Sequence, residues 1–315
     1  MGTKVFIDGH EGTTGLRIHK RLQARPDIEL IGIDPAERKN PAAVKKCMEA
    51  ADIVFLCLPD AAAVEAVALA DGTNVRIIDT STAHRSDPAW TYGFAELSGQ
   101  QFEAISKTKR LANPGCHASG VIAAVRPLTE AGLMGGDYPL SAFSLTGYSG
   151  GGKKMIAKDE SGEKTAELSA PRQYGLTQNH KHLQEIVTVC KLQREPVFLP
   201  VVDDYYSGME VAVPVFTHLF GEKVGLAEVR DVLAAHYDGS PFVHVHAAGE
   251  DKGGFLAANS LSGYDDMDIF VTGNDERIVV TVLFDNLGKG ASGAAIENMN
   301  IMLGLDPATG LVLHG

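Results

Sequence analysis

The chain has few cysteines, and none of them stands at the C-x-x-C spacing of a metal or redox motif. Its 315 residues include four cysteines, which are Cys47, Cys57, Cys116 and Cys190. A chain of this length can bury a full hydrophobic core and does not depend on a disulfide framework. We therefore expect a reducing compartment and a cytoplasmic location.

Positive charge and long apolar runs are also scarce. Lys and Arg together number 28 against 40 for Asp and Glu, which gives a net charge of −12. A net negative chain repels phosphate backbones and anionic lipids. In addition, no stretch of the sequence approaches the roughly 18 uninterrupted apolar residues of a membrane-spanning helix. We therefore expect neither a nucleic acid nor a membrane as a partner, and we look for a small-molecule substrate.

Short apolar runs alternate with helical stretches over the first third of the chain. Continuous apolar strands separated by helices are typical of a parallel sheet with helices on both faces. After Pro114 a long helix and longer, more alternating strands follow, which predicts a mixed sheet. We predict an α/β protein with two domains. A Rossmann-type doubly wound dinucleotide-binding domain spans residues 1–115, and a C-terminal helix in residues 290–315 returns to it. An α+β domain for catalysis, substrate binding and oligomerisation spans residues 116–289.

A glycine-rich turn joins the first predicted strand to the first predicted helix. Gly9, Gly12 and Gly15 stand at G-x-x-G-x-x-G spacing, and Thr13 and Thr14 lie within the same turn. Backbone amides at a helix start, together with the helix dipole, suit a pyrophosphate. With a strand before it and a helix after it, the turn predicts a dinucleotide site.

Two kinds of charge follow the second predicted strand, which is expected to end at Asp34. A carboxylate at this place accepts hydrogen bonds from an adenosine ribose and favours NAD. Arg38 and Lys39 follow closely, and their positive charges favour the 2′-phosphate of NADP. The residues alone leave the choice between the two cofactors open.

The strongest local signal is the Asn-Pro-Gly-Cys sequence that ends at Cys116. A rigid turn followed by a predicted helix places this thiol at the positive end of the helix dipole, which lowers a thiol pKa and favours the nucleophilic thiolate. A helix end alone supplies too little stabilisation, so a nearby histidine is implied. The segment with His180, His182 and Glu185 contains two imidazoles and a carboxylate, and it is our candidate for the base.

Two further segments carry polar groups suited to ligands. Ser149, Gly150 and Lys153 belong to a basic glycine-rich loop after a predicted strand, and such loops form nests for phosphate or carboxylate groups. Asn286 lies in the turn between the last predicted strand and the last predicted helix. Its amide side chain is a candidate partner for a nicotinamide carboxamide.

A pair of histidines on one predicted strand superficially suggests a metal site. His244 and His246 alternate along the chain and share one face of that strand. No cysteine or other third ligand is spaced nearby, as a metal site requires. We therefore expect an ordinary strand face and no metal site.

Five motifs in this order resemble those of the N-acetyl-gamma-glutamyl-phosphate reductase family: the glycine-rich turn, N-P-G-C, S-G-G-G-K-K, N-x-H-x-H-x-x-E and D-N-L-x-K-G-A. The resemblance spans nearly the whole chain and is to the shorter form of the family, which is itself similar to aspartate-semialdehyde dehydrogenase. It implies NADPH-dependent reduction of N-acetyl-gamma-glutamyl phosphate to N-acetylglutamate semialdehyde through a cysteine thioester. Inorganic phosphate is released, the pathway is arginine biosynthesis, and a homodimer or homotetramer is expected.

The resemblance also implies roles for individual residues. Cys116 matches the family nucleophile, and one histidine of the 180/182 pair matches its acid/base, for which we prefer His180. The segment 79–85 is similar to the family's D-x-S-x-x-F-R sequence, with His84 in place of the usual aromatic residue. It implies that Arg85 binds substrate or phosphate. It also implies that Ser81 of this segment binds the cofactor, as does Pro59 in the turn after the third predicted strand.

Three other functions remain open on the residues alone. One is an aspartate-semialdehyde dehydrogenase-like reductase that acts on another acyl phosphate. The second is a cysteine hydrolase that uses Cys116 and His180 without a nicotinamide cofactor. The third is a nucleotide-sensing regulatory protein that has kept the fold but lost the chemistry. The glycine-rich turn speaks against the hydrolase because a hydrolase needs no dinucleotide site.

Overall fold

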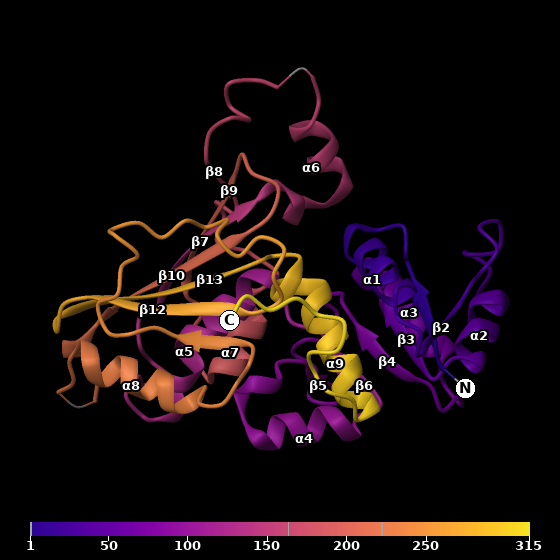
Figure 1. Cartoon of the computed structure of the whole chain (residues 1–315), viewed down its shortest axis with the longest axis horizontal. Helices are drawn as coiled ribbons and strands as arrows, with labels where there is room; N and C mark the ends of the chain where they lie inside the picture. The colour runs from indigo at the N-terminus through magenta and orange to yellow at the C-terminus, as the bar shows by residue number, and fades with distance from the viewer. Residues whose placement is uncertain (1, 163, 222) are drawn as a thin grey trace. The chain divides into compact units, whose positions relative to one another are not determined.

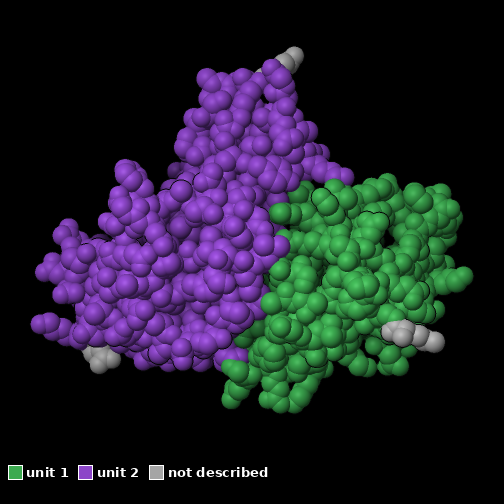
Figure 2. Space-filling model, viewed as in Figure 1, with its two compact units in different colours: residues 1–95, 99–114, 291–311 green, residues 96–98, 115–290, 312–315 purple. Residues whose placement is uncertain are grey.

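The computed structural model describes residues 2–162, 164–221 and 223–315. The chain divides into two compact units, coloured green and purple in Figure 2. Unit 1 comprises residues 1–95, 99–114 and 291–311, and unit 2 comprises residues 96–98, 115–290 and 312–315. Of the helices in the described part of the chain, none combines the length and the hydropathy that crossing a membrane requires.

Among the described residues, unit 1 contains a six-stranded parallel sheet in the order β2-β1-β3-β4-β6-β5 (Figure 1). Its strands are β1 (Thr3–Asp8), β2 (Ile28–Ile31), β3 (Ile53–Leu56), β4 (Arg76–Asp79), β5 (Thr91–Tyr92) and β6 (Arg110–Ala112). Its helices are α1 (Thr13–Gln23), α2 (Pro41–Ala50), α3 (Asp60–Leu69), α4 (Gly99–Lys107) and α9 (Gly293–Leu303).

The core of unit 1 has two layers, one on each face of this sheet. Side chains alternate along β1, so that Val5 packs into one hydrophobic cluster and Phe6 into the other. The first cluster takes in apolar residues of α1, α4 and α9, and the second takes in residues of α2 and α3. The prediction of a parallel sheet covered on both faces is confirmed.

The second strand is shorter than the sequence predicts. β2 ends at Ile31, which pairs with Phe6 of β1, and the prediction that the strand continues to Asp34 is wrong. Beyond Ile31 the chain leaves the sheet and forms a turn, in which the amide of Glu37 donates a hydrogen bond to the Asp34 carbonyl over 2.8 Å. Asp34 therefore lies in a loop beyond the sheet.

Unit 2 contains, within the described residues, a seven-stranded sheet in the order β11-β12-β13-β10-β7-β9-β8. Its strands are β7 (Ser141–Gly147), β8 (Arg172–Gln173), β9 (Val197–Asp203), β10 (Met209–Phe216), β11 (Val243–Val245), β12 (Met267–Gly273) and β13 (Arg277–Phe284). The pairs β11/β12 and β7/β9 are parallel and the others are antiparallel. The predicted mixed sheet is confirmed.

Helices α5 (Cys116–Glu130), α7 (Leu183–Cys190) and α8 (Leu226–His236) lie on one side of the seven-stranded sheet (Figure 1). The short helix α6 (Gly152–Asp159) follows the glycine-rich loop after β7. α5 is buried along most of its length, with Val121, Ile122 and Val125 fully inaccessible to water. Burial of this apolar face fixes the start of α5, where Cys116 stands.

Candidate active site

Cys116 is the first residue of α5. Gly115 precedes it with an extended backbone and caps the helix without a side-chain hydrogen bond. The first turn contains no acidic residue, so the positive end of the helix dipole is directed at the thiol. Cys116 is partly exposed, whereas Cys190 is buried and burial raises its pKa. Of these two thiols, Cys116 is the one that reagents can reach.

Cys116 opens into a cavity of about 420 Å³ within unit 2, a size typical of small-molecule sites. The cavity is lined by Cys116, His117, Thr146, Gly150, Gly151, Met155, Arg172, Tyr174, His180, Lys181, His182 and Val202. The structure thus brings together four of the residues that the sequence singles out, from α5, from the loop after β7 and from the segment before α7. Arg172 and Tyr174 were not anticipated from the sequence.

Three imidazoles meet in this cavity. The ring centroid of His117 lies 5.7 Å from those of both His180 and His182. His117 is buried, and its two nitrogens lie 2.6 Å from Ser144 Oγ and 2.6 Å from the Tyr174 hydroxyl. Burial lowers its pKa well below the usual value. His117 is therefore neutral and held in place between two hydroxyl groups.

His180 is a neutral histidine with a defined ring proton. Desolvation by burial, together with the positive charge of neighbouring groups, lowers its pKa to about 4. Its Nδ1 accepts a hydrogen bond of 3.3 Å from the backbone amide of His182. A neutral imidazole carries one proton, so this proton lies on Nε2. His180 therefore offers an N–H donor.

His182 makes a contact that favours the opposite tautomer. Its Nδ1 is hydrogen-bonded to Oε1 of Glu185, one helical turn further along, and both side chains are buried. A carboxylate at Nδ1 favours a ring proton on that nitrogen, and the neutral form of this tautomer has Nε2 as its proton acceptor. Oε2 of the same carboxylate accepts a hydrogen bond of 3.2 Å from the amide of Gly115. Glu185 thus ties His182 to the backbone immediately before Cys116.

The D-N-L-x-K-G-A segment that follows β13 passes close to Cys116. A side-chain carbon added at Gly290 would lie 3.1 Å from Cys116 Cβ, so glycine is needed for this close approach. The amide of Asn286 is engaged inside unit 2: its Oδ1 accepts from the Gly208 amide and its Nδ2 donates to Ser149 Oγ. The predicted contact of Asn286 with a nicotinamide stays a prediction.

The basic groups around the cavity differ in their partners. Arg172 donates to Asp159 over 2.7 Å through one nitrogen. Among the described atoms, its buried Nε has no hydrogen-bond partner. Gly150 lines the cavity, while Ser149 and Lys153 are not part of its described lining. Ser149 is buried and Lys153 is exposed. Arg172 therefore lines the cavity and carries one guanidinium N–H without a partner among the described atoms.

The glycine-rich turn lies at the carboxyl ends of the unit 1 strands. Gly9 has a φ of +85°, and a side-chain carbon at Gly9 or Gly15 would collide with a neighbouring carbonyl oxygen. The cap residue Gly12 makes no side-chain hydrogen bond at the start of α1. The open helix start fits the pyrophosphate of a dinucleotide. The strand after β1 lies on one side of it and the strand after β3 lies on the other side, so the strand order reverses between β1 and β3. Open α/β sheets bind ligands at such a point.

The other cofactor candidates of unit 1 lie in loops that follow strands. The Asp34 carboxylate accepts a hydrogen bond of 2.9 Å from the amide of Ala36. Arg38 forms an exposed ion pair with Glu11 of the glycine-rich turn. Pro59 caps the start of α3, just after β3.

The segment after β4 is held by buried polar contacts. Ser81 Oγ donates to Asp79 over 2.7 Å, and His84 Nδ1 lies 2.6 Å from the same carboxylate. The His84 ring stacks on Trp90 with 4.1 Å between centroids, so it fills the place of an aromatic side chain. Arg85 donates to the carbonyls of Asn113 and Thr80. Arg85 thus belongs to unit 1, and its expected role with substrate stays a prediction.

Known protein families match this chain along most of its length. Residues 4–105 match the semialdehyde dehydrogenase NAD binding domain, and residues 116–286 match the semialdehyde dehydrogenase dimerisation domain. N-acetyl-gamma-glutamyl-phosphate reductase of Brucella anthropi is 48% identical over 96% of this chain and 99% of its own. The enzyme of Brucella ovis is 48% identical over 96% of this chain and all of its own. The chain belongs to the N-acetyl-gamma-glutamyl-phosphate reductase family.

Solved structures give the same fold at low sequence identity. Aspartate semialdehyde dehydrogenase II of Vibrio cholerae, in complex with ASA, has a TM-score of 0.70 at 16% identity, over 96% of this chain and 98% of that one. The enzyme of Francisella tularensis has a TM-score of 0.71 at 16% identity, over 96% of this chain and all of that one. The family resemblance inferred from the five motifs is confirmed. Membership in this family favours the reductase over the aspartate-semialdehyde and hydrolase alternatives.

Proposed function

We propose that this chain reduces N-acetyl-gamma-glutamyl phosphate to N-acetylglutamate semialdehyde with NADPH and releases phosphate, as a step of arginine biosynthesis. The name of the relatives supports the substrate. The observation that carries the proposal is the cavity in which the thiol at the start of α5 shares its walls with His180 and His182. A thiol, a proton donor and a proton acceptor in one cavity suit covalent acyl transfer.

The reaction begins with the thiol in this proposal. His182 Nε2 takes the Cys116 proton, and the sulfur attacks the acyl carbon of the substrate. The bond between that carbon and the phosphate oxygen breaks, phosphate leaves, and a thioester remains on Cys116. When bound, the reduced nicotinamide would supply a hydride to the thioester carbon, and the aldehyde forms only when sulfur leaves that carbon. The carbon–sulfur bond then breaks and Cys116 regains its thiolate.

His180 acts on the acyl oxygen. Its Nε2–H donates a hydrogen bond to the oxygen that becomes negative when sulfur or hydride adds to the carbon. The backbone amide of Cys116, at the start of α5, is assigned as a second donor of this kind. Glu185 has a positioning role, because it fixes the tautomer of His182 and holds the Gly115 amide.

Cations of both units serve the anionic substrate in this proposal. Arg172, whose buried Nε lacks a partner among the described atoms, binds a substrate carboxylate or the phosphate. Lys181, Gly150 and the neighbouring Lys153 form the rest of the anion site in unit 2. For Arg85, in unit 1, a role with substrate or phosphate rests on the family resemblance alone. Arg–phosphate and Arg–carboxylate bonds are charge-assisted and therefore strong.

We assign cofactor binding to residues 1–115 with 290–315, and catalysis to residues 116–289. Gly9, Gly12, Thr13, Thr14 and Gly15 hold the pyrophosphate at the open start of α1. The remaining cofactor contacts are assigned to Asp34, Arg38, Pro59, Ser81 and Asn286. One observation favours NADP(H) over NAD(H): the Arg38 side chain is exposed and pairs with Glu11 of the glycine-rich turn, so its positive charge lies beside that turn.

The cofactor preference has a direct test in Arg38→Ala. Loss of a charge-assisted bond to the 2′-phosphate costs about 1.5–3 kcal/mol, so the KM for NADPH is expected to rise about tenfold or more. The KM for NADH is expected to stay unchanged. Lys46→Ala, at an exposed position of α2, is the matched control. Equal changes for both cofactors, or none for either, would rule out this role of Arg38.

The reaction and its substrate are tested together in the reverse direction. N-acetylglutamate semialdehyde, NADP⁺ and inorganic phosphate are expected to produce NADPH, which is followed by the absorbance of the reduced nicotinamide. Omission of phosphate is expected to stop turnover, because the thioester then has no acceptor. Aspartate semialdehyde in place of the acetylated substrate is the control. Equal or faster turnover of aspartate semialdehyde would contradict the proposed substrate.

We further propose a cytoplasmic homodimer or homotetramer. One face of the seven-stranded sheet carries Phe143, Val197 and Phe216, which are 37%, 55% and 45% exposed. The register places these side chains on the same face as Ala212, which pairs with Phe143. An apolar sheet face of this kind suits contact with a second copy. The four free cysteines are in keeping with a reducing compartment.

A further inference from the structure

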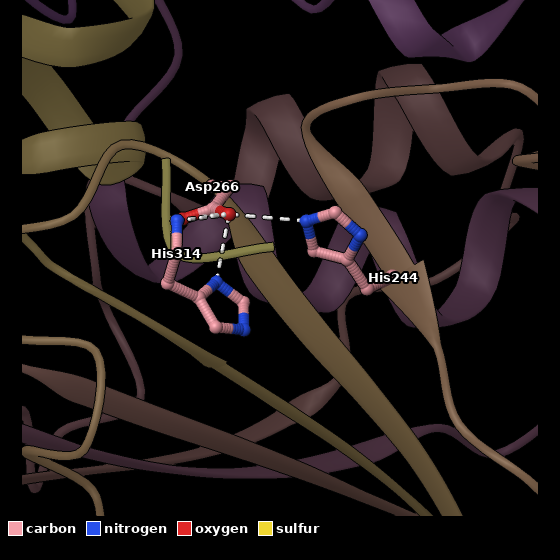
Figure 3. Close-up of side chains that lie close together, drawn as sticks. All are labelled: His244, Asp266 and His314. Atoms are coloured by element: carbon pink, nitrogen blue, oxygen red, sulfur yellow. Dashed lines mark hydrogen bonds and ion pairs between the residues drawn. The ribbon is translucent and has the colours of Figure 1, made fainter. Parts of the chain in front are cut away.

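Two histidines and an aspartate converge at one edge of the seven-stranded sheet. His244 Nε2 lies 3.0 Å and His314 Nδ1 lies 2.7 Å from the same oxygen, Oδ2 of Asp266. Figure 3 shows the two imidazole rings directed at this oxygen from different sides. β11 forms this edge of the sheet, whereas the cavity is lined from β7, β8 and β9, near the opposite edge. The cluster is therefore separate from the candidate active site.

Strand pairing and the chain's last residues create this cluster. β11 runs parallel to β12, with His244 opposite Asp268, and Asp266 lies two residues before Asp268 on the same face. The segment with His314 is held beside them, because Val312 exchanges two hydrogen bonds with Asp265, of 2.7 and 2.9 Å. The backbone amide of His314 also donates to Asp266 Oδ2 over 3.0 Å.

The carboxylate at the centre is buried and incompletely bonded. Asp266 is 0% exposed, and its Oδ1 has no hydrogen-bond partner among the described atoms. A buried carboxylate surrounded by imidazoles is costly unless it is paired or binds a metal ion. The side chains of His244 and His314 are 28% and 25% exposed, so an ion and its water ligand have access from solvent.

A second carboxylate stands behind one of the imidazoles. His314 Nε2 lies 3.3 Å from Asp268 Oδ1, and this side chain is 9% exposed. Histidines that bind metal through one nitrogen commonly donate the other N–H to a carboxylate, which orients the ring. Here the two atoms are within ion-pair distance, and Asp268 Oδ1 has no hydrogen-bond partner among the described atoms. His246 lies 3.1 Å from the same Asp268 oxygen and 3.2 Å from Glu250. The negative charge of these carboxylates favours a cation at the centre.

We propose that His244, Asp266 and His314 bind a divalent transition-metal ion, with Asp268 as the positioning residue for His314. Two imidazole nitrogens and a carboxylate oxygen form a donor set that Zn²⁺ accepts, with water in the fourth place. Bonds of about 2.05 Å at tetrahedral angles place ligand atoms about 3.3 Å apart. The observed separations of 2.7 and 3.0 Å need to widen by only a few tenths of an ångström. The ion attaches residues 312–315 to the sheet edge.

The test is calorimetric titration of the chelator-treated full chain with Zn²⁺. The Cys116→Ser variant is used throughout, so that the cavity thiol contributes no ligand. One equivalent of Zn²⁺ is expected to bind per chain. His314→Gln and His244→Gln are expected to weaken binding about 100-fold or more, and Asp268→Asn about 10- to 100-fold. His218→Gln, at an exposed histidine elsewhere in unit 2, is the matched control and is expected to bind as the parent does.

Two further measurements keep the test decisive. Circular dichroism of each variant shows that it is folded, and Co²⁺ in place of Zn²⁺ is expected to give a visible absorption band that His314→Gln abolishes. The proposal is overturned if the parent takes up no stoichiometric Zn²⁺, or if folded His314→Gln and His244→Gln bind as tightly as the parent. Loss of binding in His180→Asn instead would move the site to the cavity and overturn it equally.

Discussion

Replacement of Cys116 by serine is expected to reduce turnover by about 10⁴-fold or more, a loss of the size found when a covalent nucleophile is removed. A serine hydroxyl is a much weaker nucleophile at neutral pH than a thiol at a helix start. NADPH affinity, measured by nicotinamide fluorescence, is expected to stay at the parent value. The glycine-rich turn that we assign to the cofactor belongs to unit 1, whereas Cys116 belongs to unit 2.

The matched control is Cys47→Ser, which alters a partly exposed cysteine of α2. This variant is expected to keep both its turnover and its NADPH affinity. If Cys116→Ser loses NADPH binding in proportion to its turnover, the residue is part of a cofactor site rather than the nucleophile. If it keeps more than about a tenth of the parent rate, covalent catalysis by this sulfur is excluded.

His180→Asn is expected to reduce kcat by about 10²- to 10⁴-fold, the usual contribution of a positioned proton donor. The amide nitrogen of asparagine takes the place of Nδ1 and does not reach the position of Nε2, so the hydrogen bond to the acyl oxygen is lost. His218→Asn is the control, since it changes an exposed histidine that is not in the described cavity lining. A kcat for His180→Asn within twofold of the parent would contradict the assignment.

The pH profile gives this prediction a second readout. His180 has a pKa of about 4 because burial disfavours its charged form. The neutral ring is therefore present above pH 4. As the pH falls through that value Nδ1 gains a proton and can no longer accept the His182 amide, which is the contact that orients the Nε2–H donor. The parent is expected to keep its kcat between pH 5 and 7. A loss of activity centred near pH 6.5 that disappears in His180→Asn would show an ordinary, unshifted histidine and contradict the proposed role.

Much of the fold follows from local patterns in the sequence. Val5, Phe6 and Ile7 form a continuous apolar run, and the structure buries them on both faces of a parallel sheet. A buried strand of this kind needs a helix before its next parallel neighbour, so the alternation of elements is visible without a structure. The end of β2 was harder to place, because the apolar run continues past Ile31 although pairing with β1 stops there.

The sequence predicts only part of the candidate site, because long-range strand pairing brings some of its residues to the cavity. The Asn-Pro-Gly sequence before Cys116 identifies it as a candidate nucleophile. The N-x-H-x-H-x-x-E motif identifies His180 and His182 as candidate bases. No local motif identifies Arg172 and Tyr174, because a pairing between strands far apart in the sequence brings them to the cavity. Arg172 of the two-residue strand β8 pairs with Val202 of β9, and Val202 also lines the cavity. A strand of two residues has too little pattern to be recognised.

At the sheet edge, tertiary structure brings together ligands that lie far apart in the sequence. His244 has no third ligand nearby in the sequence, which led to the expectation of no metal site. Parallel pairing of β11 with β12 and the fixed segment 312–315 bring Asp266 and His314 to it. The spacing of these residues along the chain does not show that Asp266 and His314 lie beside His244. The tautomers of His180 and His182 are likewise set by contacts that only the folded chain defines.

The central step in the proposed reaction is the formation of a thioester on Cys116. It is tested by incubating the full chain with N-acetylglutamate semialdehyde and NADP⁺ in the absence of phosphate, followed by mass spectrometry of the intact chain and its peptides. The expected result is one N-acetylglutamyl group on the peptide with Cys116, removed when phosphate is added. An unmodified Cys116 in enzyme that turns over normally with phosphate, or an acyl group on a different residue, would contradict the mechanism.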